Sequence, residues 1–386
     1  MPAVTTAANG KLALLPLQPQ APATETLTWK TDVLQSHNGT EQRIQVRALP
    51  RQGFSYSLPA QHAEASRTLN LLYGSIREPH AVPVWTESQF IGVVTPGETT
   101  LTAVVDKYDF RNSSLALLWQ SPRQWQVLEI NTVGSGVLNL NSTTISFSAA
   151  YLMPLRVGRV SGSGRRKTNG YSAEHMLDFD IDDNVAFSPS APTQYKGQDI
   201  YYDEILFDGT SILDEVSRRE DIADFELGLV SVRSPWLYSR IRRPYNKILD
   251  GASEIWQFRQ WLHRRAGRYR AFWQPSFEND VELKSSGTIV STIQISANDY
   301  LTWAQDRKHL AFLANGVWSP REVLSVTQIN PDLLELTLDS ALNLAANSIS
   351  RISYLGLKRL DTDNVELNWI GAGVCQVSIN MLEISP

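Results

Sequence analysis

Four aspartates, Asp178, Asp180, Asp182 and Asp183, form the densest group of side chains that could bind a cation. Alternating carboxylates are typical of calcium loops, because Ca²⁺ needs several oxygen ligands. An EF-hand loop would place glycine at the position of Asp183 and glutamate at the position of Pro189, so this motif is excluded. A non-standard cation site stays an alternative, and we expect a solvated strand edge.

Other catalytic signatures are missing from the sequence. It contains no His-Glu-x-x-His pattern, no cysteine pair with zinc spacing, no nucleophile elbow and no Walker loop. Gly162-Ser163-Gly164 does not introduce a helix, which argues against a phosphate-binding loop. We therefore predict no catalytic, cofactor-binding or metal-binding residue, no cofactor and no enzymatic activity.

Basic side chains gather in two places that could bind a partner. Arg165-Arg166-Lys167 is expected to form a compact basic loop, and we favour a solvated hairpin tip. The alternative is a contact to an acidic face of a neighbouring subunit or to DNA passing through a channel. A second cluster brackets a predicted helix, and arginine is enriched at protein interfaces. We predict a subunit interface there, with solubility as the alternative, for Arg242, Arg243, Arg264, Arg265 and Arg268.

Two tryptophans extend this predicted interface. Trp256 and Trp261 are five residues apart on the same predicted helix, so their side chains point about 140° apart. They cannot both enter one domain core, and aromatic anchors often dominate interface energies. At least one of the two is therefore expected to face a partner.

The composition sets the class of protein. The chain has 386 residues, of which 42% are hydrophobic and 19% charged, with a net charge of −5. This composition supports two or three folded domains and argues against a protein that coats nucleic acid. No apolar stretch approaches the ~20 residues of a membrane span. The single cysteine, Cys375, excludes an intrachain disulfide and is expected to be a small buried hydrophobe.

The elements that must position these side chains are mostly strands. Apolar and polar residues alternate in many short runs, including Phe54–Leu58 and Val377–Met381, which predicts strands with one buried face. Apolar spacing predicts one helix over Ser253–Arg265, started by Asp250 or Ser253 and closed by Gly267, and a weaker one over about His62–Tyr73.

The order of these elements repeats along the chain. Residues 51–58 and 242–249 precede the two helices at an offset of 191 (242 − 51), and residues 138–140 match 334–336 at 196 (334 − 138). This predicts a mainly β fold with few helices, built as two tandem divergent β-sandwich or barrel units with one α-helix each. The expected domains are an extended N-terminal arm (1–28), a first repeat (29–185), an ordered connector (186–226) and a second repeat (227–386).

Several blocks resemble tail proteins of long-tailed, non-contractile bacteriophages, especially their distal tail proteins. The resembling residues of the first half are Thr31–Leu34, Asn38–Arg43, Arg47, Pro50 and Arg51. Those of the second half are Glu254–Arg259, Trp261, Leu262, Gly267, Arg268, Phe272–Phe277 and Asp280. The resemblance covers roughly residues 29–386 and implies a structural protein of the virion tail tip, assembled in the host cytoplasm.

The resemblance also implies partners. It predicts a ring or adaptor between the tail tube protein and the tail hub protein with its fibres, without membrane contact and with DNA only passing through. Distal tail proteins usually carry one such unit, whereas two are expected here. Three chains with two units each would match a six-fold tube to a three-fold hub, so a pseudo-six-fold trimer is favoured over a hexamer. The alternatives are a carbohydrate- or receptor-binding module of the tail tip and a cell-wall hydrolase.

Overall fold

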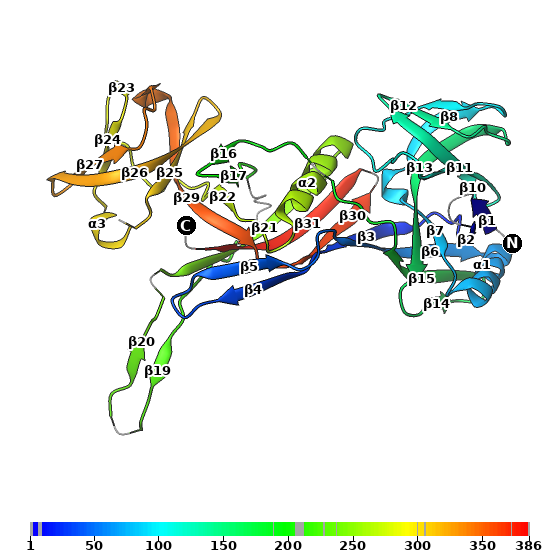
Figure 1. Ribbon diagram of the computed structural model, residues 1–386, viewed down its shortest axis with the longest axis horizontal. Helices are drawn as coiled ribbons and strands as arrows, with labels where there is room; N and C mark the ends of the chain where they lie inside the picture. Colours follow the sequence, from blue (N-terminus) through cyan, green and yellow to red (C-terminus); the bar gives the residue numbers. More distant parts are fainter. Residues whose placement is uncertain are drawn as a thin grey trace.

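The computed structural model describes residues 3–6, 10–187, 189–204, 212–226, 228–236, 238–298, 300–304, 306–371 and 373–384. Strands dominate and helices are few, which confirms the predicted mainly β class. Figure 1 shows an elongated molecule, with one group of strands at each end and the helix α2 (Ala252–Arg265) between them. No helix within the described ranges is long and apolar enough to span a membrane.

The first half of the chain forms a sheet, a helix and an outer group of strands. Its helix α1 spans His62–Ser75 and a 3-10 turn, η1, spans Trp85–Glu87. Its strands are Ala3–Thr6 (β1), Gly10–Leu14 (β2), Gln20–Thr28 (β3), Thr31–Gln35 (β4), Glu41–Gln45 (β5), Arg51–Gln61 (β6), His80–Pro83 (β7), Gln89–Val94 (β8), Thr100–Thr102 (β9), Leu115–Ser121 (β10), Gln124–Gly134 (β11), Val137–Leu140 (β12), Phe147–Val160 (β13), Arg165–Thr168 (β14) and Ser172–Ile181 (β15).

The second half repeats this arrangement with α2, a four-residue helix α3 (Tyr300–Trp303) and a 3-10 turn η2 (Ala346–Ser348). Its strands are Gln194–Tyr195 (β16), Gln198–Ile200 (β17), Glu215–Ser217 (β18), Asp221–Ala223 (β19), Ser231–Arg233 (β20), Arg240–Asp250 (β21), Phe272–Pro275 (β22), Thr288–Ile289 (β23), Thr292–Ser296 (β24), His309–Ala314 (β25), Val317–Asn330 (β26), Leu333–Leu338 (β27), Leu344–Ala345 (β28), Ile349–Leu360 (β29), Asn364–Gly371 (β30) and Val374–Glu383 (β31).

Strand pairing follows the same plan in both halves. β6 pairs with β15 in the first half, as β21 pairs with β31 in the second. β13 pairs with β7, β10 and β15, and β29 pairs with β22, β25 and β31. Even the less regular hairpins match, because β4–β5 corresponds to β19–β20. Two units with one pairing plan are the arrangement that an internal duplication produces.

The pairing registers give the residue correspondence between the units. Gly53 opposes Asp180 and Arg242 opposes Leu382, so the offsets of the two paired strands add up to 391 (242 + 382 − 53 − 180). The hairpins that precede β6 and β21 set the first offset at 189, since 221 − 32 and 233 − 44 are both 189, which leaves 202 for the second. The predicted offset of 191 is therefore two residues too long. A two-residue slip leaves every side chain on its own face of a strand, so the alternation could not reveal the error.

Both predicted helices are present, with small differences at their ends. α1 runs through Gly74 to Ser75, past the predicted stop. α2 begins after Gly251 without a side-chain cap, whereas Asp250 or Ser253 was expected. At its end Ala266 already has the left-handed conformation (φ 53°), one residue before the predicted Gly267 (φ 66°). The last turn closes by a hydrogen bond from the Ala266 amide to the Leu262 carbonyl.

The prediction of an extended arm over residues 1–28 is wrong for residues 10–28. The run Leu12–Leu15 is buried, and β2 adds in parallel to β7. β3 lies between β6 and β30 and pairs with both. Prolines interrupt the apolar runs of this segment, which made it resemble a coil, and its strand partners are up to about 340 residues away in sequence.

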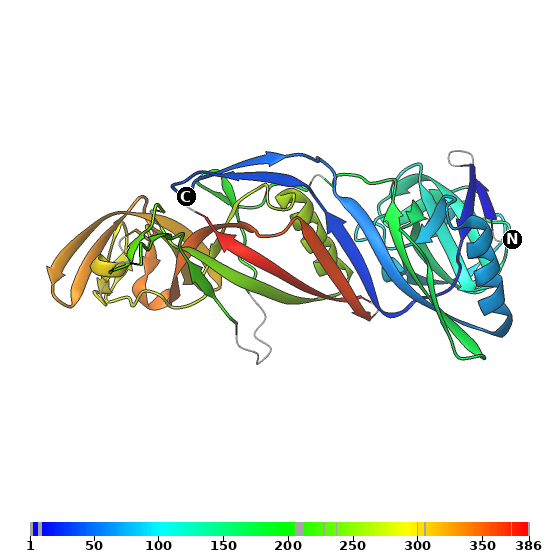
Figure 2. The ribbon, with the colours of Figure 1, turned by 90° about the horizontal axis from the view of Figure 1, so that it is seen from below.

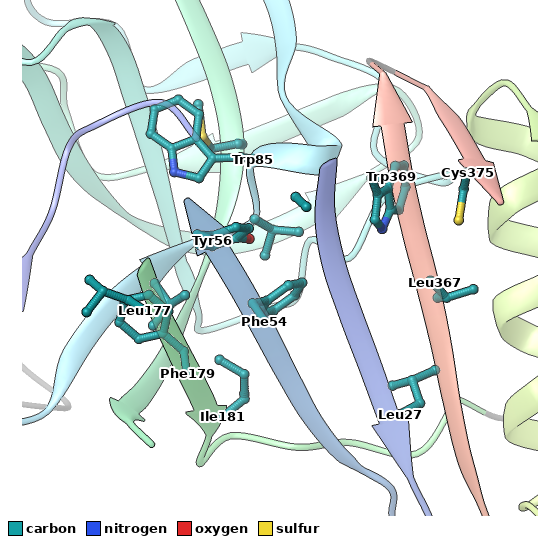
Figure 3. Packing of buried hydrophobic residues seen from close by; sticks show 14 of the residues in the cluster. Leu27, Phe54, Tyr56, Trp85, Leu177, Phe179, Ile181, Leu367, Trp369 and Cys375 are labelled. Carbon is teal, nitrogen blue, oxygen red and sulfur yellow. The ribbon is translucent and has the colours of Figure 1, made fainter. Parts of the chain in front are cut away.

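The largest core lies on one face of the joined sheet and crosses both units. Figure 3 shows Phe54 and Tyr56 of β6 and Leu27 of β3 beside Leu367 and Trp369 of β30. Each outer strand group has a core of its own, centred on strands β8–β13 in one unit and on strands β24–β29 in the other. The two units therefore share one hydrophobic core, which packs against the sheet that joins them.

Candidate assembly interface

The joint between the two units is an antiparallel strand pair, β3 with β30. Six residue pairs connect them, from Ala23 opposite Trp369 to Thr28 opposite Asn364. On the polar face, the Thr24 hydroxyl donates to the Asn368 side-chain oxygen at 3.0 Å and Thr28 to Asn364 at 2.7 Å. This joint is an edge-to-edge contact between two like units and shows how one such unit can bind the next.

A buried ion cluster fixes the joint from the core side. Arg259 of α2, in the second unit, donates to Glu25 of β3 at 2.7 Å and also binds Glu87, both in the first unit. The three side chains are at most 2% exposed. Burial raises the pKa of Glu87 despite the nearby Arg259, whereas Glu25 and Glu87 raise the pKa of Arg259 against the effect of its burial.

Further hydrogen bonds satisfy these buried carboxylates. The Gln52 amide donates to Glu25 at 2.8 Å, and the Asp109 backbone N–H donates to Glu87 at 2.6 Å. Burial of a charge is tolerated where a counter-ion and hydrogen bonds compensate for the lost water. The sequence analysis missed this cluster. A usable signal was the position of Glu25, which lies in phase with the buried Ala23 and Leu27.

A second ionic contact lies at the hairpin β4–β5 of the first unit. Glu41 accepts from Arg240 at 2.5 Å and from Arg359 at 2.9 Å, both in the second unit. Hydrogen bonds and charge from these arginines lower the pKa of Glu41, although burial opposes the shift. Nearby, Asp363 accepts from the Thr31 backbone N–H at 2.8 Å. The hairpin therefore holds the neighbouring unit beyond the strand pair itself.

The arginines predicted for a subunit interface bind carboxylates of their own chain. Arg264 and Arg265 both bind Asp199 of β17, and together they lower its pKa to about 2 against its burial. The other three pair within the described part of the chain, Arg242 with Glu215 and Asp361, Arg243 with Asp214 and Glu278, and Arg268 with Asp363. Arg265 is 1% exposed, so this side chain holds α2 against β17 rather than a neighbour.

The predicted interface tryptophans also pack inside the chain. Trp261 stacks on Tyr201 with ring centres 4.3 Å apart and meets Phe258 and Phe272 at 5.4 and 5.3 Å. Trp256 is half-buried, with its ring 5.0 Å from that of Phe187. Trp261 therefore packs inside the chain, whereas Trp256 is partly exposed beside Phe187 of the connector.

The predicted basic loop is strand β14. Arg165, Arg166 and Lys167 pair with β15, and all three are exposed. Among the described residues, β14 has no strand on its other edge. The segment is therefore an exposed strand edge rather than the predicted loop tip.

The aspartates at 178–183 are used in pairing and packing. Asp182 binds Arg159 at 3.1 Å, and the Asp183 carboxylate lies near Arg111 and Arg156. Within the described ranges, no group of three or more histidine, cysteine or acidic side chains could hold a metal ion. Cys375 is buried, and burial raises its pKa to about 12, which makes it a poor nucleophile.

A pocket of about 450 Å³ lies at the base of the two projecting hairpins. Trp236, Tyr238, Asn38 and Arg240 are among its lining residues, and the Arg240 guanidinium lies 4.6 Å from the centre of the Trp236 ring. Figure 1 shows the hairpin β19–β20 extending away from the body of the molecule. Comparison of the sequence with protein-family models and with curated proteins finds no match.

Proposed function

We propose that this chain is a structural component of the tip of a long, non-contractile phage tail. Three copies close a ring of six like units between the tail tube protein and the tail hub with its fibres. The observation that carries the proposal is the β3–β30 joint, by which one unit binds the next through strand edges. A unit that binds its like in this way can repeat until a ring closes.

The polar face of the joined sheet supports a channel through the ring. On β3 this face carries Thr24, Thr26 and Thr28, while the alternate positions enter the core. On β31 it carries Gln376, Ser378 and Asn380, again opposite buried residues. Figure 2 shows strands of both units running side by side through the middle of the molecule. A face of hydroxyls and amides is suited to water and to DNA that passes without binding.

Electron microscopy and mass measurement of the purified chain test this proposal. Three chains of 43.2 kDa give a particle of about 130 kDa with a central hole. A particle of about 260 kDa would show that the ring contains six chains rather than three. A chain that stays monomeric up to about 100 µM contradicts the proposal.

The pocket at the hairpin base favours a second candidate, binding of carbohydrate at the tail tip. Its volume falls in the range of small-ligand sites, and it combines aromatic with amide and guanidinium groups. A glycan array on the wild type and on Trp236→Ala tests this candidate. Binding that is lost in the variant would support it, and no binding by the wild type would exclude it.

A further inference from the structure

We propose that neighbouring copies join head to tail, with β18 of one copy pairing with β14 of the next. This inference rests on the proposed ring and specifies the contact that closes it. The partner is a second copy of this chain, because the contact continues an interface that already exists within the chain. We call the β3–β30 contact the inner seam and the β18–β14 contact the outer seam.

The inner seam supplies the geometry. Its first strand, β3, corresponds to β18 of the second unit, since Thr26–Gly53 and Glu215–Arg242 are equivalent pairs at an offset of 189 (215 − 26). Its second strand, β30, corresponds to β14 of the first unit, because Arg166 opposes His175 as Leu367 opposes Val377. The offset there is 201 (367 − 166). Each unit thus has one strand of each kind. Within a chain, β3 of the first unit pairs with β30 of the second, whereas the equivalent strands β18 and β14 take no part in this contact.

The unused strands have open edges. β18 pairs with β21 and β14 with β15, and neither has a second partner among the described residues. All residues of both strands are exposed. The apolar side chains Leu213 and Val216 stand on or beside β18 with 81% and 66% of their surface exposed. Open edges with exposed apolar residues are sites for addition of a strand.

If β18 and β14 pair in the same register as β3 and β30, side chains of opposite charge face each other across the outer seam. In the inner seam Thr26 opposes Glu366 and Glu25 opposes Leu367. The equivalent outer pairs are Glu215 with Arg165 of the next copy, and Asp214 with Arg166 of the next copy. No charge was used to find this register, so the match of two acids with two arginines is an independent observation in its favour.

The same charges select the direction of assembly. Two β14 edges would bring arginine and lysine together, and two β18 edges would bring acids together, so both symmetric pairings are repelled. Only the pairing of β14 with β18 is attractive. A head-to-tail contact of this kind generates closed rings or open filaments, whereas a symmetric contact stops at a dimer.

Charge reversal tests the seam. Glu215 and Arg165 are suited to it, because their side chains are 63% and 68% exposed and their contacts within the chain are long, 4.0 Å to Arg242 and 3.9 Å to Asp178. Asp214 is left unchanged because it binds Arg243. We expect Arg165→Glu and Glu215→Arg each to weaken association by about tenfold or more per seam, and the double variant to recover it.

A matched control and a direct probe complete the experiment. Lys284→Glu makes the same change of charge at an exposed loop position of the second unit, where Lys284 binds Glu282, and should assemble like the wild type. Arg165→Cys combined with Glu215→Cys should give disulfide-linked dimers and trimers on oxidation, since the native Cys375 is buried.

The outcomes separate the seam from the ring. Wild-type rings that tolerate Arg165→Glu and Glu215→Arg, with no cross-link in the cysteine variant, overturn the seam and leave the proposed ring intact. A wild type that stays monomeric overturns both the outer seam and the proposed ring. The charges of β14 would then serve to keep this edge strand from pairing with other chains. If both single variants lose association and the double variant recovers it, the outer seam is established.

Discussion

Replacement of Arg259 by methionine should destabilise the joint between the units more than any other single loss of charge. The change leaves Glu25 and Glu87 buried without a counter-ion, since both side chains are at most 2% exposed. Removing one partner of a buried ion pair costs about 3–5 kcal/mol in free energy of unfolding. For a chain of this length, with an unfolding entropy of about 0.8 kcal/mol/K, the melting temperature should fall by roughly 5 °C.

The loss should also depend on pH. Burial already raises the pKa of Glu87, and removal of the Arg259 charge will raise it further. The folded state then holds a proton that the unfolded state releases above about pH 4, so stability falls as the pH rises through this interval. We therefore expect the cost of Arg259→Met to be smaller at pH 5 than at pH 8.

Urea unfolding followed by tryptophan fluorescence at both pH values measures these effects. Arg351→Met is the matched control, because Arg351 binds Glu204 at the surface, where an ion pair contributes at most about 1 kcal/mol. The triple variant that adds Glu25→Gln and Glu87→Gln should regain most of the loss. A cost below about 1 kcal/mol for Arg259→Met, equal at pH 5 and pH 8, would refute the role given to this cluster.

Four further substitutions test other parts of the structure. Trp261→Ala should cost about 3–5 kcal/mol in free energy of unfolding, because the ring packs on Tyr201, Phe258 and Phe272; near-native stability with lost assembly would restore the interface role predicted from the sequence. Asp199→Asn should remove stability that the wild type has above about pH 4 and loses as the pH falls toward 2, so the urea midpoints of the two proteins should converge in acid. Gly158→Ala should destabilise the fold by about 1–3 kcal/mol, because a Cβ atom would lie 2.5 Å from the Asp180 carbonyl oxygen. Gly74→Ala in α1 meets open space and should stabilise the fold by about 0.5–1 kcal/mol. Equal melting temperatures for these two variants would contradict the packing described.

Local patterns in the sequence were sufficient for the strands, for α2 and for the existence of a repeat. Alternation over Phe54–Leu58 and the apolar face of Ile255, Phe258 and Leu262 depend on neighbouring residues only, and both are confirmed. The burial of Cys375 followed in the same way. Such patterns fix which face of an element is buried but not what covers it.

The site depended on contacts that no local pattern records. The arginines around α2 were assigned to a subunit interface because their partners within the chain, such as Asp199 and Asp363, lie 65 and 95 residues away. The N-terminal segment was predicted to be an extended arm because β3 gains its partner β30 from the far end of the chain. At least one of Trp256 and Trp261 was expected to face a partner because Tyr201, which stacks on Trp261, belongs to the connector.

The two seams differ in a way that fits an assembly built in steps. The inner seam joins strands of nine and eight residues, β3 and β30, and adds the buried Arg259 cluster. The strands β18 and β14 of the proposed outer seam have three and four exposed residues, so the ion pairs proposed between them would also be exposed. Because exposed pairs are screened by salt and buried ones are not, the joint within a chain should persist where the joint between chains opens. Raising the salt concentration should therefore dissociate rings into intact monomers, with no change in the melting temperature of the monomer. Rings that resist molar salt would mean that apolar contacts such as those of Leu213 and Val216, rather than charge, hold the outer seam.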